Sequence, residues 1–198
     1  VKDGTLSLNP TTAGGENRAI VISDGESYVW QNKTYRVAFD LTIKNRPNTA
    51  VSDKLEIKGL QGDAKNVWST IVSTPLASIP VCGSSAELNA TTRYNLTITM
   101  PANTYWMIFR YEGDSRNNVY TEFYIDNLQI DEVIPVTATS EDSAKGTAFV
   151  TNKNTEVQDF VLGETAVFTA TACEGYEFDG WYNGNTKIEG AEATYETK

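Results

Sequence analysis

The residues of this sequence best suited to chemistry are aromatic side chains that lie close to planar polar groups. Residues 105–111 read YWMIFRY, and an extended strand would alternate them between two faces. If Met107 and Phe109 point into a core, Trp106 and Arg110 share the outer face. An indole stacks on the apolar side of a pyranose ring, and a guanidinium hydrogen-bonds its hydroxyls. The alternative is a central strand that is buried on both faces.

Three further aromatic residues are candidate ligand contacts. Tyr28 and Trp30 follow the turn-like run SDGE at residues 23–26, and Trp68 lies in another short β-rich run. Aromatic side chains beside loops are well placed to contact a ligand. The competing interpretation is that each one seals the rim of a hydrophobic core.

The sequence lacks the residues of the common catalytic sites. It contains no histidine, no phosphate-binding Gly-Lys-Ser or Gly-Lys-Thr loop and no Cys-x-x-Cys pair. A glycosidase needs only two carboxylates, and the 26 acidic residues leave that alternative open. None of them lies in a glycosidase motif, so we predict a protein that is not an enzyme.

The charge of the chain restricts its partners. A net charge of -10 without any concentration of Lys and Arg argues against nucleic acids and anionic membrane surfaces, and leaves neutral ligands such as sugars. No stretch approaches the roughly 20 apolar residues of a membrane span. The first residues lack an apolar signal core, so we expect that an export signal has been removed.

Period-two alternation of apolar residues predicts an all-β protein. It is clearest at residues 34–43 and 94–100, and shorter β-rich runs separated by Gly, Asn, Asp and Pro surround them. This pattern favours an antiparallel β-sandwich over residues 1–133. Small and polar residues then predict a linker at 134–145. Beyond the linker, the runs 146–151, 164–172 and 176–182 predict a small β-rich module over 146–198.

Two segments resemble known bacterial families. Residues 32–40 (NKTYRVAFD) and 123–130 (FYIDNLQI) are similar to two strands of the jelly-roll carbohydrate-binding modules attached to xylanases. Residues 163–170 (GETAVFTA) and 175–181 (GYEFDGW) resemble the internalin-type B-repeat of surface proteins. The second resemblance implies a β-grasp-like spacer in which Trp181 has a packing role.

The first resemblance also implies a structural calcium ion. Asp126 would be one ligand, Asp3 or Asp24 an early partner, and oxygen ligands are what this ion prefers. The opening segment is atypical, which leaves loss of the ion as the alternative.

These observations together predict a non-catalytic carbohydrate-binding region of a secreted or surface-anchored bacterial protein. Its partner would be a polysaccharide or a host or cell-surface glycan, met outside the cell or on its outer surface. The alternative is a structural or adhesion spacer without a sugar ligand, in which Trp30, Trp68 and Trp106 are all buried. A hydrolase with an unrecognised carboxylate pair is a third hypothesis.

Overall fold

The computed structural model of the chain describes residues 6–8, 19–22, 30, 32–45, 53–61, 71–81, 89–112, 122–154 and 159–198. These residues form strands and turns and no helix, which confirms the predicted all-β class. The chain divides into two compact units, Val1–Asp131 and Glu132–Lys198, which we call the N-terminal and C-terminal units.

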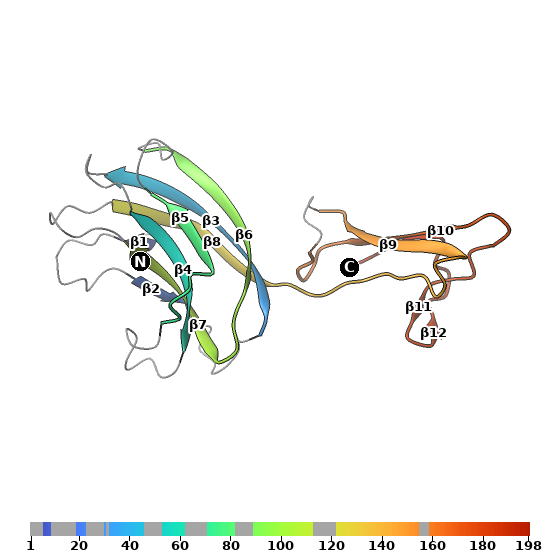
Figure 1. The fold of residues 1–198 in the computed structure, drawn as a ribbon. Coiled ribbons are helices and arrows are strands. Elements are labelled where there is room, and N and C mark those ends of the chain that lie inside the picture. Colours follow the sequence, from blue (N-terminus) through green and yellow to red (C-terminus); the bar gives the residue numbers. More distant parts are fainter. Residues whose placement is uncertain are drawn as a thin grey trace. The chain divides into compact units, whose positions relative to one another are not determined.

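The N-terminal unit contains two four-stranded sheets (Figure 1). The first sheet has the order β1 (Leu6–Leu8), β8 (Glu122–Glu132), β3 (Thr34–Asn45) and β6 (Thr91–Thr99). The second has the order β2 (Ala19–Ile22), β7 (Thr104–Glu112), β4 (Lys54–Gln61) and β5 (Ala77–Pro80). Apart from the consecutive strands β4 and β5, neighbours in sheet order are far apart in sequence, so the sheets are held together mainly by long-range pairing.

The core of this unit lies between the two sheets. Alternate residues of β3, among them Val37 and Phe39, are fully buried, because one face of a half-buried strand carries every second side chain. Ile57 of β4 and Phe109 of β7 face them from the second sheet. The rings of Phe39 and Phe109 meet edge to face at 5.4 Å, a favourable aromatic geometry. The two apolar faces therefore form a sandwich-like core.

The C-terminal unit is built on a three-stranded antiparallel sheet with the order β13 (Thr194–Thr197), β10 (Ala166–Ala172) and β9 (Gly146–Asn152). A two-stranded hairpin, β11 (Tyr182–Asn183) and β12 (Thr186–Lys187), accompanies it (Figure 1). The predicted strands at 146–151 and 164–172 correspond to β9 and β10.

The predicted strand at 176–182 is largely wrong, because residues 173–181 lie outside the strands and only Tyr182 joins β11. Gly175 adopts a positive φ of 83°, which turns the backbone away from an extended course. The strand that completes the sheet is β13, which our sequence analysis did not predict. Its residue Tyr195 pairs with Phe168 of β10.

Candidate functional site

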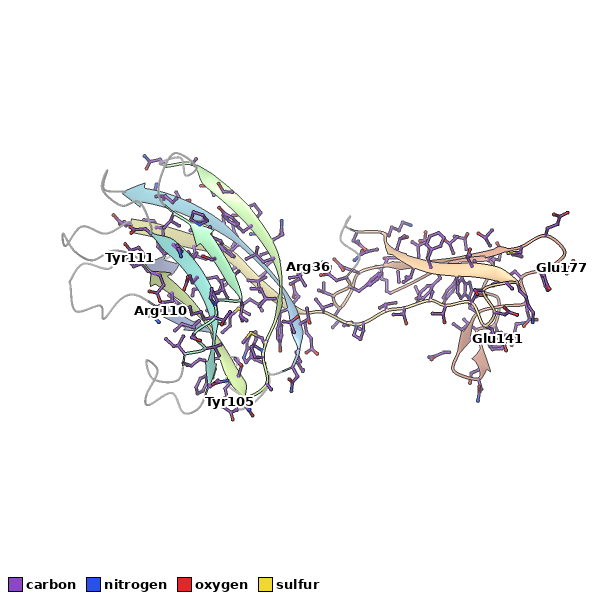
Figure 2. The ribbon with its side chains drawn as sticks, in the orientation of Figure 1. Arg36, Tyr105, Arg110, Tyr111, Glu141 and Glu177 are labelled. Atoms are coloured by element: carbon purple, nitrogen blue, oxygen red, sulfur yellow. The ribbon has the colours of Figure 1, made fainter. Side chains whose placement is uncertain are left out.

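Strand β7 presents different side chains on its two faces. Met107 and Phe109 are fully buried in the core, whereas Trp106 and Arg110 occupy the other face and are each half-buried. Ile108, which lies between them on that face, is also fully buried. The strand is therefore buried on both faces at its centre and partly accessible to solvent at Trp106 and Arg110. Figure 2 shows Arg110 well separated along β7 from Tyr105, the neighbour of Trp106.

The register with β4 adds charged residues to the same face. Trp106 pairs with Leu60, and Arg110 pairs with Glu56 across the antiparallel ladder. Lys58 pairs with Ile108, midway between these two positions. Because side chains directly opposite each other in paired strands are neighbours, Glu56 and Lys58 lie beside the β7 residues.

Glu112, the last residue of β7, joins Glu56, Lys58 and Arg110 in a continuous chain of ion pairs. The Nζ of Lys58 lies 2.9 Å from Oε2 of Glu56 and 3.5 Å from Oε1 of Glu112. The same Oε1 of Glu112 lies 2.9 Å from Nε of Arg110. Two cations and two carboxylates thus neutralise one another. We call Trp106, Glu56, Lys58, Arg110 and Glu112 the β7–β4 platform.

Burying the charged side chains of the platform reduces the free energy gained on folding. Glu56 and Lys58 are each 7% exposed, and removing charges from water costs several kcal/mol per ion before their mutual attraction repays it. A stable sandwich has no need of such residues on a sheet face, since apolar residues of similar size serve stability as well or better. Departures of this kind from simple packing rules are typical of functional sites.

Trp30 lies in the hydrophobic core of the N-terminal unit. It is 6% exposed, and its ring centroid lies 4.7 Å from that of Tyr35, which is also buried. A ring enclosed in this way leaves no face on which a sugar can stack. Tyr28 and Trp68, the other two candidates, lie outside the described residues. Trp181 contacts the rings of Phe168 and Phe178 in the C-terminal unit.

Asp126, the residue predicted to bind calcium, is exposed on β8. Its carboxylate is exposed and accepts a hydrogen bond of 2.8 Å from the backbone N–H of Asn127. Within the described ranges, no group of three or more His, Cys, Asp or Glu residues is arranged to hold a metal ion. The early partners expected for it, Asp3 and Asp24, lie outside those ranges.

The first sheet carries a second polar cluster that the sequence did not suggest. Arg93 of β6 donates to Oδ1 of Asp40 at 3.3 Å, to the carbonyl of Asn127 at 2.9 Å and to Oε1 of Gln129 at 3.0 Å. The side-chain amide of Asn127 donates to Oδ2 of Asp40 at 2.6 Å. These bonds tie β6, β3 and β8 together on the exposed side of the sheet.

This cluster makes one pH-dependent prediction. The hydrogen bond from Asn127, followed by the interaction with Arg93, holds the pKa of Asp40 below its ordinary value. A lowered folded-state pKa stabilises the protein above the unfolded pKa of about 3.9, and this contribution is lost as the pH falls through the folded value. We expect Asp40→Asn to lower the urea midpoint at pH 7, and the difference from wild type to shrink below about pH 4.

The control for this prediction is Asp131→Asn, which removes an exposed carboxylate from β8 of the same sheet. A difference between Asp40→Asn and wild type that stays constant from pH 7 to pH 2.5 would contradict the assigned role of Asp40.

Comparisons with known proteins identify no relative of this chain. A scan against models of protein families finds no match, and neither does a search of curated proteins. The resemblances to a carbohydrate-binding module and to a B-repeat therefore stay predictions. Across the described parts of the chain, no helix has the length and apolar character needed to span a membrane.

Proposed function

We propose that the N-terminal unit is a non-catalytic glycan-binding module and that the β7–β4 platform contacts the sugar. The observation that supports this most directly is the position of Trp106, half-buried on the sheet face that also carries the four linked charged groups. The indole would stack on the apolar side of a pyranose ring. Arg110 and Glu112 would hydrogen-bond its hydroxyls.

The charges of the platform favour a neutral ligand. Two cations and two carboxylates are already paired, so an anionic sugar would have to displace Glu112 from Arg110. A neutral sugar can hydrogen-bond to the same groups while their ion pairs persist. We infer a polysaccharide or a host or cell-surface glycan as the ligand class, met in an extracellular or outer-surface setting.

Binding fits the platform better than hydrolysis does. Glu56 and Glu112 are its only carboxylates, and Lys58 pairs with both of them. The chain also has no histidine to act as a general base. Release of shortened products from any glycan would contradict this assignment and favour the hydrolase hypothesis.

The test is isothermal titration calorimetry of the wild-type protein with soluble glucans, xylans, mannans and host glycans. For the glycan that binds, we expect Trp106→Ala to weaken affinity about tenfold or more, as loss of a central aromatic contact does. The control is Phe149→Ala, which removes an aromatic side chain that is 49% exposed in the C-terminal unit. Equal affinities for the two variants would contradict the proposed site.

The second candidate function is a structural or adhesion spacer without a sugar ligand. The burial of Trp30 and of Ile108 favours it, because both side chains are used for packing and not for an open binding surface. If none of the glycans binds the wild-type protein, the spacer function is the one supported.

A further inference from the structure

The C-terminal unit contains a concavity of about 1150 Å³ that its own side chains leave open. Its lining includes Phe168 and Ala170 of β10 together with Phe178, Trp181 and Ile188. We call this feature the aromatic groove. Its volume exceeds the range of roughly 300–1,000 Å³ that is usual for small-molecule pockets. Its size therefore fits an occupant larger than a single sugar.

The aromatic groove is also the place where the core of this unit is incomplete. Among the described residues of the unit, the buried ones are Phe160, Ala166 and Asn152. The rings of Phe168 and Trp181 meet at 5.6 Å, yet both residues keep part of their surface exposed. Aromatic side chains contribute much to binding where a partner covers them, and exposed apolar patches bounded by polar residues mark interaction sites.

Acidic residues line the same groove. Glu141, Asp142, Glu177 and Asp179 line the groove together with a single cation, Lys145. Lys145 is itself paired with Asp142 at 3.5 Å. Figure 2 shows Glu141 and Glu177 toward the same end of the C-terminal unit. A lining with more carboxylates than cations favours a partner with positive charge.

The carboxylate of Asp179 keeps its charge over a wide pH range. The hydroxyl of Tyr182 donates a hydrogen bond to it, and the ammonium group of Lys187 lies 3.4 Å away. These two interactions, in this order, lower the pKa of Asp179 below its ordinary value. Asp179 therefore stays ionised at neutral pH, and Lys187 offsets part of its charge.

One side of the groove is an extended segment whose backbone is available for pairing. Residues 137–139 line the groove, and no backbone hydrogen bond joins residues 136–139 to another part of the described chain. The segment begins after the bridge between Ile134 and Phe160, where the N–H of Ile134 donates to the carbonyl of Phe160 at 2.7 Å. Exposed peptide groups along an extended segment are a template for an added strand.

We propose that the aromatic groove binds an extended, positively charged peptide segment of a partner protein. Apolar side chains of the peptide contact Phe168, Phe178 and Trp181. Its lysine or arginine side chains lie toward Glu141 and Glu177, and its backbone pairs with residues 136–139. This interaction is independent of the glycan platform, because every residue that lines the groove belongs to the C-terminal unit.

The test uses a fluorescein-labelled peptide of alternating lysine and leucine, Ac-KLKLKLK-NH2, with the full chain and fluorescence anisotropy as the measurement. We expect the double variant Glu141→Gln/Glu177→Gln to bind it about five- to tenfold more weakly than wild type, and 0.5 M NaCl to weaken wild-type binding similarly.

The matched control is Glu174→Gln/Glu189→Gln, which removes two exposed carboxylates of the same unit that do not line the groove. Both double variants remove two negative charges, so a general attraction of the acidic chain for a basic peptide would affect them equally. Equal affinities of the two variants, equal binding of Ac-ELELELE-NH2, or no binding of the lysine peptide by wild type would each overturn the proposal.

Discussion

Replacing Lys58 with methionine is expected to lower the free energy of unfolding of the N-terminal unit by about 3–5 kcal/mol, the range found when one partner of a buried ion pair is removed. The side chain of Lys58 is 9% exposed and lies between Glu56 and Glu112, at 2.9 and 3.5 Å. Methionine keeps the volume and removes the charge. Glu56, whose side chain is also 9% exposed, is then left as a buried carboxylate without this counter-ion.

Urea unfolding followed by tryptophan fluorescence measures this loss. The matched control is Lys54→Met, because Lys54 is an exposed lysine on the same face of β4 and pairs with Glu112. An exposed substitution of that kind changes stability by no more than about 0.5 kcal/mol. The double variant Glu56→Leu/Lys58→Met should recover much of the loss, since it removes both charges together. Similar values for Lys58→Met and Lys54→Met would contradict the burial of the ion pair.

Truncation of Phe109 to alanine should lower the free energy of unfolding by about 3–5 kcal/mol, because it leaves a cavity between the two sheets. This is the usual range for a buried phenylalanine. Phe109 is fully buried and contacts the ring of Phe39 at 5.4 Å. It also lies on the strand that carries Trp106 and Arg110. Loss of its packing should therefore weaken glycan binding as well as stability.

Chemical denaturation of Phe109→Ala alongside Phe149→Ala tests this expectation. Phe149 is 49% exposed, so its loss removes little buried area and should cost less than about 1 kcal/mol. If the two substitutions lower the free energy of unfolding equally, Phe109 does not occupy the core between the sheets.

The two predictions concern opposite faces of a single sheet. Phe109 holds β7 against the core, whereas Lys58 and its partners hold the charged groups beside Trp106. A ligand platform needs both, because its side chains must be fixed before the ligand arrives. A protein that is stable without Lys58 would weaken the case for the platform as well as for the ion pair.

Local pattern alone was sufficient for most strands of the N-terminal unit and for their two faces, whereas it missed β5 and β13. The alternation at residues 34–43 predicted β3, and the alternation at 105–111 placed Trp106 with Arg110, opposite to Met107 and Phe109. A strand repeats every two residues whatever its surroundings, so its faces can be assigned from the sequence alone. At residues 176–182, which follow the positive-φ residue Gly175, a strand was predicted and only Tyr182 joins one.

Tertiary structure decided which side chains meet. Glu56 and Lys58 join Arg110 and Glu112 through the register of β4 with β7, over a separation of about 50 residues. Arg93 reaches Asp40 and Asn127 on two other strands in the same way. Pairing between distant strands depends on the summed burial of two apolar faces and the loops that close them. No local pattern records these quantities. The sequence therefore determined most strands of the N-terminal unit and their faces, and the packing of the two sheets determined the site.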